Sequence, residues 1–287
     1  MTNLHLLFYI SAFSVLVSVL LGSSLPNEEP IAIEVMNASR SAMEDVRSYT
    51  VTLETFQQTD YLNGNEGFRN NFRQVAKIRE APLQFKQEIN AVHEVIDKFG
   101  ALVCLTNSIK EQTYFDDGKG SFTRSDDTKN WIYHSHSNGE DFLFFSDFRL
   151  SQKDQFQLFD YYSASVSVNE YDGSYVLKLT NELIDDSDLL YYLKTFGEEH
   201  LIFAEFFGGS KKIEDLDIQY FEYSLFIDKA DMTVSKANVV AELYSGEVGK
   251  QALTKQVVNM DWTDMNQHLP LKIPEEILTQ TGYVFNN

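Results

Sequence analysis

The sequence predicts an α+β fold in which a one-sided antiparallel sheet is covered by amphipathic helices. Three observations support this prediction: an apolar helical repeat near residue 30, a series of segments in which apolar and polar residues alternate, and turn sequences between those segments. With 43% hydrophobic and 14% aromatic residues, the 287-residue chain can form a large core. Because it has only five Pro and no low-complexity linker, we expect a single domain over residues 30–285.

The first expected element is a helix in residues 30–46, "PIAIEVMNASRSAMEDV", with Pro30 in its first turn. Apolar side chains recur there at the spacing of one helical face. They are Ile31, Val35, Ala38, Ala42, Met43 and Val46. Such a helix needs a surface to cover, which the following strands would supply.

The next segments change to a two-residue period, which is typical of half-buried strands. In "YTVTLETF" the residues Tyr49, Val51 and Leu53 share one face, opposite Thr50, Thr52 and Glu54. "FRQVAKIRE" and "LQFKQEINAVHEV" behave similarly. Their shared-face residues are Phe72, Ala76 and Ile78 in the first, and Leu83, Phe85, Ile89 and Ala91 in the second. One-sided strands of this kind belong to an antiparallel sheet with one wet face.

Residues 113–124, "TYFDDGKGSFTR", combine two Asp, two Gly and a Lys, as phosphate and metal sites do. A phosphate-binding loop would need its Lys after the second Gly and a helix behind it, and the order here differs. An EF-hand loop with Gly118 at its sixth position would start at Thr113, where an Asp is needed. The segment therefore predicts a hairpin turn between two short strands. A further strand is expected in "TKNWIYHSH".

The second half of the chain predicts helices set between further strands. Residues 151–162 repeat Phe156, Phe159 and Tyr162 at helical spacing, and a hairpin is expected to turn at Asp172 and Gly173. Short helices are expected in residues 187–197 and 198–209, and after Pro274. Strands are expected in residues 220–227, 233–244 and 251–262. The inward residues of the first two are Phe221, Tyr223, Leu225 and Ile227, and Ala237, Val239, Ala241 and Leu243.

The N-terminus predicts an extracytoplasmic protein. No side chain from Leu4 to Leu21 is ionised at neutral pH, and small residues follow at 22–24, as at a signal-peptidase site. Two alternatives remain open for residues 1–24: a cleaved signal peptide, or an anchor that contacts the membrane and holds the protein at its outer face. Residues 25–29 would be a short linker.

The formal charge of −20 argues against nucleic acid as a partner, because a negative field repels a phosphate backbone. The main hydrolase, zincin and redox signatures are absent, so no enzyme, no catalytic residue and no cofactor is predicted. His134 and His136 would share a strand face, but without a third ligand nearby they do not predict a metal site. Cys104, the only cysteine, lies in an apolar run and is expected to be a buried structural residue.

Several segments together carry a resemblance to a known family. They are "MEDVRSYTVTLET", "YFDDGKGSFTRSDDTKNWIYH", "YVLKLT", "YSLFIDKADMTVSKANVVAEL" and "MDWTDMNQHLPLKIPEEIL". In this order they resemble an uncharacterised family of Firmicutes extracytoplasmic lipoproteins, which are similar in turn to lipoprotein carriers of the LolA, LppX and LprG type. One departure is Ser23, which stands where the lipobox of such a lipoprotein has its acylated Cys.

The resemblance implies a strongly curved antiparallel sheet, an open half-barrel, with short helices packed on its concave face. It also implies an apolar hollow that takes a lipid or another amphiphile. Combined with the one-sided strands, it makes eight residues candidates for the lining of such a cavity. They are Tyr49, Val51, Leu53, Phe85, Ile89, Phe221, Tyr223 and Leu225. The alternative is a filled core, in which case the protein would be an interaction or sensor module that contacts another envelope protein.

Overall fold

The computed structural model describes residues 31–62, 66–116, 119–126, 128–135, 151–183, 216–245, 251–267 and 270–283. The described elements belong to one compact unit, Ala32–Asn287. The strands are β1 (Ser48–Tyr61), β2 (Glu66–Glu80), β3 (Leu83–Asp97), β4 (Leu102–Asp116), β5 (Gly120–Ser125), β6 (Ile132–His134), β7 (Ser167–Tyr171), β8 (Ser174–Thr180), β9 (Leu216–Asp228), β10 (Val234–Ser245) and β11 (Ala252–Thr263). The helices are α2 (Ala32–Met43), α4 (Phe156–Tyr161) and α7 (Glu275–Thr281), with short 3₁₀ turns at Lys153–Gln155, Ser163–Ser165 and Asn181–Leu183.

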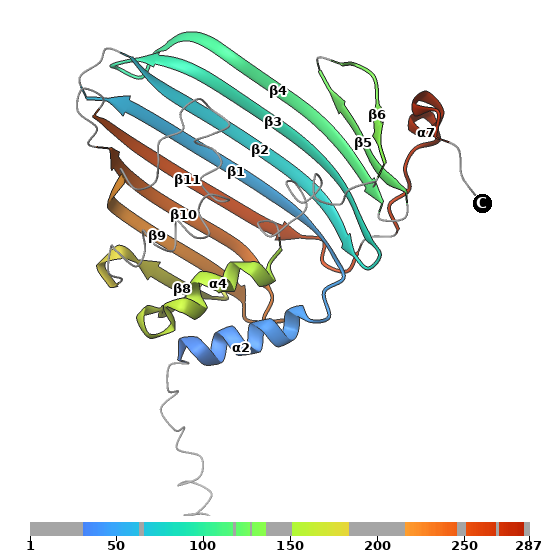
Figure 1. Cartoon of the computed structure of the whole chain (residues 1–287). Helices are drawn as coiled ribbons and strands as arrows, with labels where there is room; N and C mark the ends of the chain where they lie inside the picture. Colours follow the sequence, from blue (N-terminus) through green and yellow to red (C-terminus); the bar gives the residue numbers. More distant parts are fainter. Residues whose placement is uncertain are drawn as a thin grey trace, which may run out of the picture. The chain divides into compact units, whose positions relative to one another are not determined.

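All of these strands form one curved antiparallel sheet, in the order β6-β5-β4-β3-β2-β1-β11-β10-β9-β8-β7 (Figure 1). The sheet is open, with β6 and β7 at its two edges. It consists of two meanders, and the pairing of β1 with β11 joins them in the middle. This confirms the predicted α+β class with an open antiparallel sheet.

One face of the sheet, called the inner face here, carries the predicted apolar residues of β1, Tyr49, Val51 and Leu53, which are at most 6% exposed. Helices α2 and α4 cover part of this face, because Val35 and Met43 of α2 and Phe159 of α4 belong to the same buried cluster. Burial of this apolar surface is the main stabilising contribution to such a fold.

Helix α2 confirms the predicted first helix, but its buried face is rotated from the expected one. Met36 and Ser39 are buried beside Val35 and Met43. Ile31, by contrast, is 56% exposed, and Ala38 is exposed as well. The apolar spacing is compatible with burial of the Ala38 side or of the Met36 side of the helix. Packing on the sheet buries the side with Met36, whose side chain is larger than that of Ala38.

Helix α7 lies on the other face of the sheet, against β5 and β6. Phe122, Ile273 and Ile277 form a second buried cluster there, and Tyr133 and Tyr283 pack against it with ring centroids 5.0 Å apart. The expectation of helices on the inner face therefore holds for α2 and α4 and not for α7. Phe122 accounts for this placement. It lies opposite Tyr114 of β4, and Tyr114 is adjacent to the inward-facing Phe115, so Tyr114 and Phe122 are on the other face of the sheet.

The predicted hairpins are confirmed where the structure describes them. The described residues 113–116 and 119–124 belong to the β4–β5 hairpin, in which Asp116 pairs with Gly120 and the Lys119 amide donates to the Asp116 carbonyl at 2.8 Å. The β7–β8 hairpin turns at Asp172 and Gly173, with φ of 45° and 80°, which is the backbone that a two-residue turn between twisted strands needs. The helices expected in residues 187–197 and 198–209 lie outside the described residues, as does the whole N-terminal segment 1–24.

Candidate functional site

The eight candidate cavity residues all lie on the inner face, and all are buried. Val51 and Leu225 are fully inaccessible to solvent, and Tyr223, the most exposed, reaches only 8%. Seven of the eight belong to the cluster that includes α2 and α4; Ile89 is buried outside it. The structure thus places these side chains of β1, β3 and β9 on one face of the sheet, and the strand periodicity predicted the inward side of each strand.

Helix α4 and its preceding turn fill the space over β9. The Phe159 ring meets Tyr223 edge-on with centroids 4.9 Å apart, and the Tyr223 hydroxyl donates a hydrogen bond to Gln155. On the other side of the face, Phe85 stacks on Phe115 at 4.9 Å. This half of the inner face is therefore packed with the chain's own side chains, as a protein core is.

Further along the same strands the inner face becomes less completely buried. Thr55 lies opposite both Phe72 of β2 and Val258 of β11, and Val258 lies opposite Val239 of β10. Phe72, Val239 and Val258 are half-buried, although they touch the core. Together with Thr55, and with Ala91, which lies opposite Phe72, they form a row of mainly apolar residues across five strands, called the apolar row.

A polar row runs directly beside the apolar row, one inward position further along each strand. It consists of His93 (β3), Asn70 (β2), Gln57 (β1) and Gln256 (β11), which are neighbours across successive strands. The Asn70 amide donates to Gln57 Oε1 at 3.3 Å, and Asn70 Oδ1 pairs with His93 Nδ1. Because none of the four carries a fixed charge, the row offers hydrogen bonds without strong attraction for an ion.

Among the described inner-face residues of β1 and β3, two buried polar side-chain atoms lack a hydrogen-bond partner. They are Thr55 Oγ1, in the apolar row, and Gln87 Nε2 of β3. Thr55 is 5% exposed and Gln87 only 1%. The carbonyl of the Gln87 side chain is used, because Gln74 Nε2 donates to it at 2.9 Å. Unpaired buried polar atoms are rare and costly, so each indicates a place where a further polar group can bind.

His93 is the titratable group of the polar row. Its ring stacks on Phe68 with centroids 5.3 Å apart, and desolvation by burial lowers the pKa of His93 from its ordinary value of 6.5. The imidazole is therefore neutral at physiological pH and serves as a hydrogen-bonding group. In the polar row the side-chain amide of Asn70 is its hydrogen-bond partner.

Two other sequence predictions fall on described residues. His134 is exposed and its Nε2 lies 3.0 Å from the Thr123 hydroxyl, while His136 lies outside the described residues. Within the described ranges no group of three or more His, Cys, Asp or Glu could hold a metal ion. The prediction that Cys104 is buried is wrong, since its side chain is exposed. The apolar run around it lies at an exposed end of the sheet, which local composition cannot reveal.

The match to a family model spans almost all of the described part, residues 32–282. That model describes a family of unknown function, DUF6612. This chain belongs to the DUF6612 family. None of the curated proteins matches it. No helix in the described residues of this DUF6612 protein is long and apolar enough to cross a membrane.

Among solved structures, the DUF6612 chain is similar to a LolA superfamily protein from Nitrosomonas europaea, with 11% identity, a TM-score of 0.20, and coverage of 87% of this chain and 97% of that one. It is also similar to a DUF1329 family protein from Desulfovibrio piger, with 11% identity, a TM-score of 0.22, and coverage of 85% and 96%. The LolA superfamily, named in the sequence resemblance, is thus among these neighbours. A relationship to Firmicutes lipoproteins stays a prediction.

The polar row is the part of the site that the sequence predictions missed. The alternation in the sequence contained evidence for it. The inward positions Tyr49, Val51 and Leu53 are followed, at the same two-residue spacing, by the polar residues Thr55 and Gln57. A strand whose inward positions change from apolar to polar marks the point where the face changes its chemistry. The juxtaposition of Gln57 with Gln256 could not be found this way, because it requires the β1–β11 pairing.

Proposed function

We propose that this protein is a non-catalytic extracytoplasmic binding protein that holds an amphiphilic, lipid-like ligand on the inner face of its sheet. The apolar row would contact the hydrocarbon part, and the polar row would orient the polar part. The observation that carries the proposal is the direct adjacency of these two rows, with Phe72 and Asn70 at successive inward positions of β2 and Val258 and Gln256 at those of β11.

The unpartnered buried hydroxyl of Thr55 supports the same proposal, because Thr55 Oγ1 lies in the apolar row and would gain a hydrogen bond from a ligand's polar group. An uncharged donor and acceptor set suits a hydroxyl, ester or amide better than a phosphate, which calls for Arg or Lys. Apolar contact contributes about 0.8 kcal/mol per buried methylene, so a long chain would supply most of the affinity.

The ligand would lie beyond the residues that α2 and α4 cover. The eight residues first considered for a cavity are all buried, including Tyr223 and Phe221, which lie opposite Val239 and Ala241 at the β9 end of the rows, so their role in the proposal is to support the sheet. Phe72, Val239 and Val258 take over as the apolar contacts because they keep some exposure.

Native mass spectrometry of the protein purified from its own host tests the proposal by showing whether an amphiphile remains bound. Uptake of a fluorescent fatty acid or phospholipid by the purified full chain gives an affinity. Ala91→Trp and Ala241→Trp introduce bulk on the inner face beside the two rows, and each should weaken uptake at least tenfold, on the order of the loss of one large apolar contact.

Matched controls come from the neighbouring residues on the other face, Val92→Trp and Val240→Trp. These should bind as wild type does. If wild type takes up no amphiphile at micromolar concentrations, or if the folded inner-face variants bind equally well, the carrier proposal is overturned in favour of an interaction module with a filled core.

A further inference from the structure

The end of the β3–β4 hairpin exposes an unusual amount of apolar surface. Phe99 is 83% exposed, and Leu102, Val103 and Leu105 are 57%, 53% and 56% exposed. From Phe99 to Ile109 no side chain is charged, although charged residues make up 23% of the chain. Exposed apolar surface of this extent marks an interaction site. The segment 99–105 is called the hairpin tip below.

The turn at the hairpin tip pairs the amides of Phe99, Gly100 and Ala101 within the turn itself. The Asp97 carboxylate accepts from the amides of Phe99 and Ala101 at 2.8 and 2.9 Å. The Asp97 amide donates to the Ala101 carbonyl at 2.8 Å, and the Gly100 amide donates to the Asp97 carbonyl at 2.9 Å. Gly100 supplies the positive φ, 80°, that the turn needs. Because these amides are paired, Phe99 and the residues after it can enter an apolar medium without unsatisfied amide donors, while the Asp97 carboxylate stays at the aqueous side of the turn.

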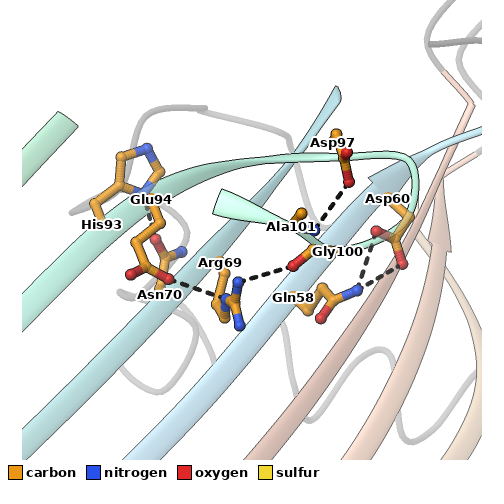
Figure 2. Close-up of polar contacts among 9 residues, drawn as sticks. All are labelled: Gln58, Asp60, Arg69, Asn70, His93, Glu94, Asp97, Gly100 and Ala101. Atoms are coloured by element: carbon orange, nitrogen blue, oxygen red, sulfur yellow. Dashed lines mark hydrogen bonds and ion pairs between the residues drawn. The ribbon is translucent and has the colours of Figure 1, made fainter. Parts of the chain in front are cut away.

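Arg69 of β2 anchors the tip to the sheet (Figure 2). Its Nη2 donates to the Gly100 carbonyl at 3.1 Å, and its Nε lies 3.0 Å from Glu94 Oε2. Both charged side chains are half-buried, so the ion pair is less screened than a surface pair. The tip is thus held in one conformation, with Phe99 at its apex.

A second apolar residue lies at the same end of the sheet. The β1–β2 turn presents Leu62, which is 56% exposed and whose amide donates to the Gln251 carbonyl at 2.9 Å. Because the strands are antiparallel, the end of β1 and the end of β3 lie on the same side of the sheet (Figure 1). Leu62 would therefore approach the same surface as the tip.

From these observations we propose that the hairpin tip inserts into the surface of a lipid bilayer. Leu102 and Val103 are consecutive strand residues, so their side chains point to opposite faces, and both are exposed. One protein partner would cover one face of the strand, whereas a lipid medium surrounds both. Lys98, adjacent to Phe99, would lie at the level of the lipid phosphates, while the net charge of −20 favours a zwitterionic surface over an anionic one. Insertion of the hairpin tip into a bilayer is a separate property from ligand binding on the inner face and does not depend on it.

The exposed Cys104 permits a direct test in the full chain, because it is the only cysteine. An environment-sensitive fluorophore on Cys104 should shift to the blue on addition of phosphatidylcholine vesicles, and lipids with a nitroxide on the acyl chain should quench it. The control carries Cys104→Ser and Tyr171→Cys, which places the label at another exposed residue, on the β7–β8 turn at the opposite end of the sheet. That label should stay in water.

Phe99→Asp in the labelled protein should abolish most of the shift, because an ionised carboxylate at the apex resists insertion. Arg69→Ala, which releases Gly100, should reduce it. The proposal is overturned if protein-free vesicles leave the emission of the Cys104 label unchanged. It is also overturned if nitroxide lipids quench the Cys104 label no more than the Tyr171→Cys label. A shift that required membranes containing protein would assign the tip to a protein partner and would equally contradict insertion into lipid.

Discussion

Gln57 of β1 lies directly opposite Gln256 of β11 on the inner face of the sheet, although the two residues come from opposite ends of the domain. Asn70 extends the contact from Gln57 into β2. The polar row therefore spans both meanders of the sheet. Its geometry depends on the central pairing of β1 with β11.

The first prediction compares the two faces of β1. Leu53→Lys places an unpaired charge at an inner position that is 6% exposed, and it should lower the free energy of unfolding by several kcal/mol, on the order of 4. Thr52→Lys, on the other face and opposite Asp261, should change stability by less than about 1 kcal/mol. Urea unfolding monitored by circular dichroism measures both. Equal losses would mean that the inner face is not the buried one.

The second prediction concerns the unpartnered hydroxyl of Thr55. Thr55→Val keeps the shape of the side chain and removes a buried polar atom without a partner, so the ligand-free protein should become more stable by about 0.5–1 kcal/mol. Thr59→Val is the matched control on the same strand face, because it breaks the 2.9 Å hydrogen bond to Thr254 and should cost about 1 kcal/mol. Loss of stability in both variants would show that Thr55 has a partner.

The third prediction concerns pH. Burial lowers the pKa of His93 below 6.5, so the unfolded chain takes up the proton more readily than the folded one. The contribution of His93 to stability is complete above pH 6.5 and is lost as the pH falls through its folded pKa. His93→Gln should therefore lose less stability than wild type between about pH 7.5 and pH 5. The NMR titration of the His93 ring supplies the pKa itself, and a value at or above 6.5 would contradict the prediction.

The fourth prediction concerns export. The uncharged N-terminal run predicts that residues after about 24 lie outside the cytoplasm, and that the protein is released or is held by this run without acylation at Ser23. Cell fractionation with N-terminal sequencing distinguishes a cleaved from a retained segment. Recovery of the complete chain from the cytoplasm, or of an acylated residue, would contradict it.

The sequence by itself determined the local structure of the described part. Alternation fixed which residues of β1, β3 and β9 face inward, since a side chain's face depends only on the parity of its position in a strand. Asp172 and Gly173 determined a hairpin because few residues tolerate a positive φ. The helix of residues 32–43 followed from apolar spacing, although the buried side of α2 was chosen by contact with the sheet.

Tertiary structure alone decided which strands are neighbours and therefore what lies on the inner face. Pairing of β1 with β11 brings Gln57 to Gln256 and Thr55 to Val258, and no local pattern encodes a contact between such distant segments. The same holds for Cys104, whose apolar neighbours resemble a core sequence but lie at the end of a hairpin that nothing in the described residues covers. Periodicity reports the face of each strand, whereas burial depends on what the rest of the chain places over it.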